Sequence, residues 1–218
     1  AEALKNTTSN QVELNSDISL ENTVCFDTGN KILDLNGYGI NYNGKESEYS
    51  MIAVEDGASL TVVNGDLTGT SAATAIGAIK KKAFNSRGGN LILNGVDITG
   101  FDSAVNVEDM AAEMDGDSIV QITNCNFDTE QIAVLIQGNG DKTDSRTKLI
   151  LQNSTINSRY YCGISGQGNS ERWGTEIVIS ESDVSGCYSG IYLPQGDSVA
   201  TITDSKISGN TGIAVKGG

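Results

Sequence analysis

Apolar residues recur along this chain in one short pattern. Two apolar positions flank a single residue, and a third apolar position follows five residues later. Short alternating segments of this kind are typical of β-strands, and none has the length or the period of an ordinary helix. The copies start 23 to 31 residues apart and are LDLNGYGI (33–40), LTVVNGDL (60–67), LILNGVDI (91–98), VQITNCNF (120–127), LILQNSTI (149–156), IVISESDV (177–184) and ATITDSKI (200–207).

A second apolar segment follows each copy after a polar turn rich in Gly, Asn, Asp and Ser. These segments are IAV (52–54), AIGAI (75–79), AVNV (104–107), IAVLI (132–136), GIS (163–165), GIYL (190–193) and GIAV (212–215). Two short strands per repeat cannot bury their own apolar side chains, so successive repeats must stack. The sequence therefore predicts an all-β fold, a single-stranded right-handed parallel β-helix (solenoid) of about seven to eight coils, where a coil is one turn of the chain about the axis.

Each coil is expected to turn its three apolar pattern positions toward the axis, where they form columns. The first column is predicted to contain Leu33, Leu60, Leu91, Val120, Leu149, Ile177 and Ala200. A bend follows the first strand of each coil. Asn tolerates left-handed backbone there, and its amide can bond to the amide of the next coil. The predicted ladder at this bend is Asn36, Asn64, Asn94, Asn124, Asn153 and Asp204.

We expect one domain over residues 1–218, with residues 1–32 as an N-terminal cap and first coil and residues 33–218 as the stacked coils. The last apolar segment is followed only by Lys216, Gly217 and Gly218. A final coil left uncovered would expose strand edges, which is an aggregation hazard. We therefore expect the natural protein to continue with further coils or a cap, or two chains to meet end to end.

The segments KILDLNGYGI (31–40) and GASLTVVNGDLTG (57–69) carry a resemblance to known proteins. They resemble the opening of adhesive repeat regions on bacterial surface proteins, and residues 12–218 resemble the pectate-lyase-like superfamily of β-helix proteins. The resemblance implies a location that is secreted or at the bacterial cell surface. It also implies either adhesin-like, non-catalytic binding of a carbohydrate or host glycan, or cleavage of acidic polysaccharide by a calcium-dependent lyase. A structural spacer within a larger surface protein is a third option, because these motifs define coil geometry and not chemistry.

The composition removes several functions. The chain has no His, which excludes Ser-His-Asp and Cys-His nucleophiles, His-ligated metals and the Gly-His-Gly motif of the β-helix hydrolases. Its 28 acidic and 14 basic residues give a net charge of −14. This charge repels nucleic acid and leaves a neutral glycan or a cation as the better partner. No apolar run approaches the roughly 18 residues of a membrane span, so we expect no membrane insertion.

The lyase hypothesis requires carboxylates on the outer face of one sheet, where lyases of this superfamily hold calcium beside an Arg or Lys base. The outward position of the first strand is predicted to carry Asp34, Thr61, Ile92, Gln121, Ile150, Val178 and Thr201. A row with a single carboxylate is a poor cation site. We therefore predict no catalytic residues and no cofactor, with calcium kept as an option. If the protein is an enzyme, it is expected to be a polysaccharide lyase.

A charged column is predicted just after the second strands, where acidic, basic and acidic residues follow one another from coil to coil. The functional interpretation makes a lysine the general base and the carboxylates calcium ligands. We favour a structural ion-pair column, because flanking carboxylates raise the pKa of a lysine rather than lowering it. The column is Glu55, Asp56, Lys80, Lys81, Glu108 and Asp109, and weaker calcium candidates in loops are Glu113, Asp115, Asp117, Asp141 and Asp144.

Most aromatic residues lie in the later coils, with two arginines beside them. Aligning Gly163 with Gly190 places Tyr161 over Tyr188. The faces of sugar rings pack on aromatic rings while Arg donates to hydroxyl groups, so one interpretation is a glycan platform. The other interpretation is aromatic stacking that covers the turns. The candidate residues are Arg159, Tyr160, Tyr161, Arg172, Trp173, Tyr188 and Tyr192.

The four cysteines contain no C-x-x-C pair, which argues against a zinc ribbon or a thioredoxin-type site. We expect Cys25, Cys125, Cys162 and Cys187 to act mainly as small buried hydrophobes. A disulfide between Cys162 and Cys187 is the alternative.

Overall fold

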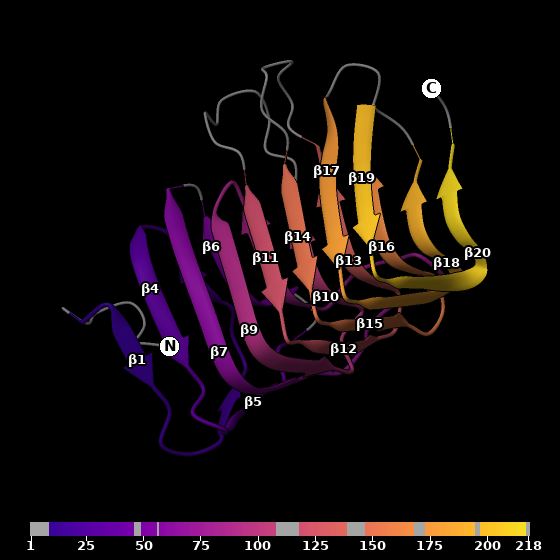
Figure 1. The fold of residues 1–218 in the computed structure, drawn as a ribbon. Coiled ribbons are helices and arrows are strands. Elements are labelled where there is room, and N and C mark those ends of the chain that lie inside the picture. The colour runs from indigo at the N-terminus through magenta and orange to yellow at the C-terminus, as the bar shows by residue number, and fades with distance from the viewer. Residues whose placement is uncertain are drawn as a thin grey trace.

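The chain winds into a stack of β-strands around one axis (Figure 1). The computed structural model describes residues 9–45, 49–55, 57–107, 118–138, 147–167, 173–194 and 197–216. Every regular element in these ranges is a strand, and the strand ladders are parallel. The predicted all-β, right-handed parallel β-solenoid is therefore confirmed. The described ranges hold no helix with the length and hydrophobicity that crossing a bilayer demands.

Three parallel sheets run along the stack. The first sheet contains β1 (Gln11–Glu13), β4 (Gly29–Asp34), β7 (Ala58–Thr68), β9 (Asn90–Thr99), β11 (Ile119–Thr123), β14 (Lys148–Gln152), β17 (Trp173–Ser180) and β19 (Asp197–Thr203). The second sheet contains β2 (Ile18–Leu20), β5 (Gly39–Tyr42), the later parts of β7 and β9, β12 (Asn126–Thr129), β15 (Thr155–Ser158) and the first parts of β18 (Asp183–Leu193) and β20 (Lys206–Val215).

The third sheet contains β3 (Val24–Phe26), β6 (Ser50–Glu55), β8 (Lys82–Arg87), β10 (Ser103–Val107), β13 (Ile132–Gln137), β16 (Cys162–Gln167) and the later parts of β18 and β20. Within each coil, a first bend joins the first sheet to the second, and a second bend joins the second sheet to the third. These two bends position the candidate sites.

Inward side chains of the three sheets form one hydrophobic core. One inward column, in register along the first sheet, has side chains that are each 0–1% exposed. Its members are Leu60, Leu91, Val120, Leu149 and Ile177. A second inward column, in the second sheet, is Leu67, Ile98, Phe127, Ile156 and Val184, and each of these is 0% exposed. The predicted columns are therefore confirmed from residue 60 to residue 184, whereas Ala200 keeps its register with Ile177 but is exposed.

Leu33 was assigned to the wrong place in its column. It pairs with Val62, and the residue in register with Leu60 is Lys31. The cause is the first bend of that coil. Four residues (35–38) separate Asp34 from Gly39, whereas only two (64–65) separate their partners Val63 and Asp66. The same shift replaces Asp34 by Ile32 in the outward row of the first sheet.

The predicted strand at residues 75–79 is also wrong, because the strand of that coil is β8, which starts at Lys82. Residues 69–81 instead form a long connection, which we call the strap, and its Ile76 side chain is 74% exposed. The fully buried Asp102 anchors the strap. Its carboxylate accepts hydrogen bonds from the Ser71 hydroxyl and from four backbone N–H groups, those of residues 72, 73, 80 and 81, at 2.8–3.3 Å.

The left-handed residues at the first bend confirm most of the predicted ladder. Positive φ angles are found at Asn36, Asn64, Asn124, Asn153 and Asp204, and also at Glu181, which was not predicted. Asn94 does not take the left-handed conformation: it pairs with Val63 and Thr123, and Gly95 (φ 65°) takes that conformation instead. Its side chain still belongs to the ladder, because Asn94 Oδ1 accepts a hydrogen bond from Asn124 Nδ2.

None of the four cysteines forms a disulfide, so the alternative Cys162–Cys187 pairing is wrong. Cys125 and Cys162 are buried as predicted, Cys25 is half-buried, and Cys187 is exposed. Cys162 accepts a hydrogen bond from the Ser189 hydroxyl at 3.3 Å. Burial therefore explains two of the four positions.

Candidate functional site

The second sheet presents a narrow polar face between the two bends. Its strands are short, and the side chains that alternate with the core residues point outward. Asn157 Nδ2 donates to Asp128 Oδ1 at 2.9 Å, and the Ser185 hydroxyl donates to Asn157 Oδ1 at 2.8 Å. Each coil thus contributes polar groups to one continuous row. The outward residues in β12, β15 and β18 are Asn126, Asp128, Thr155, Asn157, Asp183 and Ser185.

Arg159 lies at the second bend and is fixed by two carboxylates. Its Nη2 is 2.7 Å from Asp128 Oδ2, and its Nη1 is 3.1 Å from Glu130 Oε1. The hydrogen bond from Arg159 lowers the pKa of Asp128 below its usual value, and the same bond raises the pKa of Arg159. The guanidinium is therefore held in one orientation, although more than half of its side chain is exposed.

An aromatic cluster begins two residues after this arginine in the chain. We call it the tyrosine cluster, and its members are Tyr161, Tyr188 and Tyr192. The predicted stacking of Tyr161 on Tyr188 is confirmed, with ring centroids 5.3 Å apart and planes 19° from parallel. Tyr192 meets both rings edge-on at 6.3 and 6.1 Å. Burial raises the pKa of Tyr161, whereas Tyr188 is 50% exposed. The cluster therefore combines a packed ring with an accessible one.

The strap supports the packed ring of Tyr161. The Gly77 N–H donates to Gln131 Oε1 at 2.8 Å, and a methyl group on the Gly77 Cα would contact the Tyr161 ring at 3.5 Å. On the other side, the backbone N–H of Tyr188 donates to the carbonyl of Tyr161 at 2.8 Å. The Tyr161 ring thus lies close to the strap, and a backbone hydrogen bond ties Tyr161 to the next coil.

The other platform candidates are less well placed or lie outside the described residues. Tyr160 is 54% exposed at the same bend, and its backbone N–H donates to the carbonyl of Glu130. Trp173 begins β17 and pairs with Asp197, but its side chain is not among those described. Arg172 also lies outside the described residues. The structure thus brings together three of the seven candidates as one cluster, with Arg159 and Tyr160 adjacent in the chain to Tyr161.

The charged column is corrected by the strand register. Glu55 pairs with Arg87, and their side chains form an ion pair with an N–O distance of 3.7 Å. Lys80 and Lys81 precede β8 instead of following a strand, because the strap and not a strand occupies residues 75–79. The remaining members of the column, Asp56, Glu108 and Asp109, lie outside the described residues, as do the loop residues Glu113, Asp115, Asp117, Asp141 and Asp144.

The Lys81 side chain is held in place by contacts with the protein. Its side chain is buried, its Nζ donates to the carbonyl oxygens of Gly44, at 2.7 Å, and of Lys45, and it lies 5.5 Å from the centre of the Tyr42 ring. Carbonyl oxygens and an aromatic face both favour the charged form of lysine. This environment is the opposite of what a general base needs.

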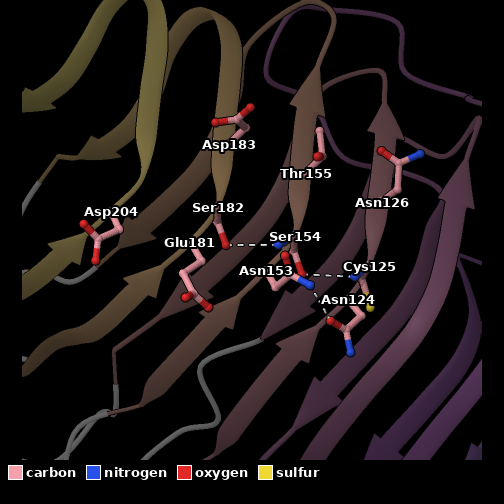
Figure 2. Close-up of a pocket in the computed structure, with 10 residues that line it drawn as sticks. All are labelled: Asn124, Cys125, Asn126, Asn153, Ser154, Thr155, Glu181, Ser182, Asp183 and Asp204. Carbon is pink, nitrogen blue, oxygen red and sulfur yellow. Dashed lines mark hydrogen bonds between the residues drawn. The ribbon is translucent and has the colours of Figure 1, made fainter.

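A polar groove of about 570 Å³ lies along the first bend (Figure 2). The amide ladder forms one side of it: Asn124 Nδ2 donates to Asn94 Oδ1 at 3.0 Å, and Asn153 Nδ2 donates to Asn124 Oδ1 at 2.7 Å. Glu181 and Asp204 continue this row along the bend. Three residues of the polar face, Asn126, Thr155 and Asp183, line the groove as well.

This groove was not predicted, although the sequence contains a signal for it. A small hydroxyl or thiol residue follows the left-handed position in four successive coils: Cys125, Ser154, Ser182 and Ser205. The Ser154 hydroxyl accepts from the Cys125 N–H at 3.0 Å, and the Ser182 hydroxyl accepts from the Ser154 N–H at 3.1 Å. Each of these serine hydroxyls also donates to the carbonyl two residues before it. This hydroxyl ladder makes the floor of the groove rigid.

Replacing Cys125 with serine is expected to leave the fold intact, since serine already occupies the same position in the next coils. Burial raises the pKa of the Cys125 thiol from 9.0 to about 11. The unfolded chain therefore loses this proton first, and stability should fall as pH rises from about 9 to about 11. At pH 7, we expect the free energy of unfolding of Cys125→Ser to lie within about 1 kcal/mol of the wild-type value. Between about pH 9 and pH 11, the variant should lose less stability than the wild type.

Urea unfolding at several pH values measures this difference. The exposed Cys187 provides the control, because Cys187→Ser should reproduce the wild-type pH profile. Identical profiles for Cys125→Ser and the wild type would contradict the prediction.

The outer face of the first sheet does not supply a calcium-binding row. Its central outward row is Ile32, Thr61, Ile92, Gln121, Ile150, Val178 and Thr201, which contains no carboxylate. Beside it, Glu176 is engaged by Lys148 at 2.8 Å. Within the described ranges, no three Cys, Asp or Glu side chains are placed to hold one metal ion.

The fold and its two bends define the class of protein as a right-handed parallel β-helix. Residues 111–218 match the family model described as right handed beta helix region. Together with the parallel ladders, this match is consistent with a β-helix of the pectate-lyase-like type. A search of curated proteins finds no match.

Proposed function

We propose that this β-helix is a non-catalytic, adhesin-like module that binds carbohydrate through the tyrosine cluster at the second bend. The observation that carries the proposal is the stacked pair Tyr161–Tyr188 with Tyr192 at its edge, in which Tyr188 is 50% exposed, at the bend that also holds the fixed Arg159. Sugar C–H faces pack on aromatic rings, and guanidinium and amide groups donate to sugar hydroxyls. A secreted or bacterial cell-surface location follows from the resemblance to bacterial adhesive repeats and is part of the proposal.

Rigidity of the site supports this function. The Tyr161 ring is held by the strap, and Arg159 is held by Asp128 and Glu130, so few side chains must be ordered when a glycan binds. A preorganised site loses less conformational entropy on binding than a flexible one. The repeated coils add a stiff rod that presents the site at a fixed position.

The test is a glycan array followed by titration calorimetry on the strongest binder. Tyr188→Ala is expected to weaken binding about fivefold or more, because it removes the accessible ring. Tyr188→Phe keeps the ring and should retain most of the affinity. The matched control is Tyr49→Ala. Tyr49 is similarly exposed (54%) and lies beside β6, five strands along the third sheet from β18.

Three results would contradict the proposal. Absence of any glycan ligand would favour a structural spacer. Release of unsaturated products that absorb ultraviolet light from polyuronates would favour the calcium-dependent lyase. Equal affinity of Tyr188→Ala and Tyr49→Ala for a glycan would place binding elsewhere on the molecule.

A further inference from the structure

The groove at the first bend and the tyrosine cluster at the second bend flank the same narrow sheet. β12 and β15 are four residues long, so the two bends are about 13 Å apart across the polar face. Asn126, Thr155 and Asp183 belong both to the polar face and to the groove. A ligand that lies on the polar face can therefore contact both bends.

The groove also has unused hydrogen-bonding capacity. In the amide ladder, each Asn Nδ2 donates a hydrogen bond to the Asn Oδ1 of the preceding coil. The ladder ends at Asn153, because the side chains of the next residues in the row, Glu181 and Asp204, have no N–H group to donate. Among the described residues, no side-chain hydrogen bond is made by Asn126 or Thr155, which are both exposed. The groove therefore offers acceptors along the bend, together with an amide and a hydroxyl on its rim.

The charge of this region selects against acidic ligands. Glu181, Asp183 and Asp204 line the groove, and Lys206 follows Asp183 in register. At the second bend, two carboxylates, Asp128 and Glu130, surround the single guanidinium of Arg159. Both ends of the polar face thus carry a net negative charge, which repels uronate and sialate groups but accepts hydrogen bonds from neutral hydroxyls.

We infer that the groove at the first bend is a second subsite for the glycan that the tyrosine cluster binds, and that this glycan is an uncharged oligosaccharide long enough to cross the second sheet. The inference rests on the proposed function. One end of the oligosaccharide packs on Tyr188, its middle lies on the polar face, and its other end donates hydroxyl hydrogen bonds to the acceptors of the groove. Affinity should then increase with chain length until both bends are covered.

The experiment compares neutral di- and hexasaccharides of glucose, xylose and mannose with the corresponding oligogalacturonates by titration calorimetry. We expect the best neutral hexasaccharide to bind at least tenfold more tightly than its disaccharide, which is too short to cross the sheet, and the galacturonates to bind more weakly than both. The double variant Asn126→Ala, Thr155→Ala should weaken hexasaccharide binding about tenfold and leave the disaccharide unchanged, since it removes two hydrogen-bonding groups from the groove. Glu181→Gln should raise the affinity for hexagalacturonate several-fold, because it removes one negative charge.

Asn41→Ala, Thr68→Ala is the matched control. It removes the same two types of side chain from the outer face of the second sheet at earlier coils, where Thr68 and Asn41 bond to each other at 3.3 Å. Equal effects of the two double variants, or tighter binding of hexagalacturonate than of every neutral hexasaccharide, would overturn the inference. If the neutral hexasaccharide binds and Tyr188→Ala weakens it but the groove variants do not, the second subsite fails while the proposed function stands. If no oligosaccharide binds, both fail.

Discussion

Asp102→Ala is expected to lower the free energy of unfolding by about 4 kcal/mol. The carboxylate of Asp102 is fully buried and accepts five hydrogen bonds, four of them from backbone N–H groups of the strap. Alanine leaves these donors without an acceptor, and each buried donor left unsatisfied costs about 1–3 kcal/mol. The net loss is smaller than the sum of these costs, because the strap can move and let water bond to some of its N–H groups. For a chain of this length, the change corresponds to a fall in Tm of about 10 °C.

Urea unfolding followed by circular dichroism measures this loss, and limited proteolysis reports the release of residues 69–81. Asp102→Asn keeps the shape and one acceptor oxygen, so about half of the effect is expected. The exposed Asp97, five residues earlier in the chain, is the control, and Asp97→Ala should stay within about 0.5 kcal/mol of the wild type. A similarly small effect of Asp102→Ala would show that the strap contributes little to stability.

Phe127→Ala is expected to destabilise the protein by about 3–5 kcal/mol. Phe127 is 0% exposed and pairs in register with Ile98 of the preceding coil and Ile156 of the following one. Truncation leaves a cavity in the middle of this column that the two neighbours fill only partly. Because each coil of a solenoid contacts only its neighbours, the weak point lies between two halves of the stack and should also reduce the cooperativity of unfolding.

Denaturant unfolding monitored by two probes detects both effects, as a lower midpoint and as transitions that no longer coincide. Phe127→Leu removes fewer atoms and should cost only about 1 kcal/mol with coincident transitions. An unchanged midpoint for Phe127→Ala would mean that Phe127 does not pack between Ile98 and Ile156 as described.

The periodic apolar pattern was sufficient to predict the fold, because every coil repeats the same inward positions. Leu91, Leu149 and Ile177 occupy the predicted column for this reason. Leu33 does not, because a pattern shows where apolar residues recur but not how many residues a bend holds. A count of spacings cannot distinguish a longer bend from a displaced strand.

The candidate site was predicted in part. Tyr161 stacks on Tyr188 because one coil repeats the other, and repetition is visible in the sequence. The strap was not predictable in the same way. Its apolar residues 75–79 imitate a strand, and its true position depends on Asp102 and Gln131, which lie 21 to 54 residues from their partners in the strap. Contacts of that kind depend on the stacking itself and leave no local pattern.

The bend at residues 35–38 shows how this architecture can change without losing its frame. It holds two more residues than the equivalent bend in the next coil, yet the strands on either side keep their partners, Leu33 with Val62 and Ile40 with Leu67. The number of residues in a bend can thus change while the strands on either side keep their register. Peptides inserted at the bends should be tolerated by the scaffold, so natural or engineered variants of this chain can acquire new surface loops while the stacked strands stay as they are.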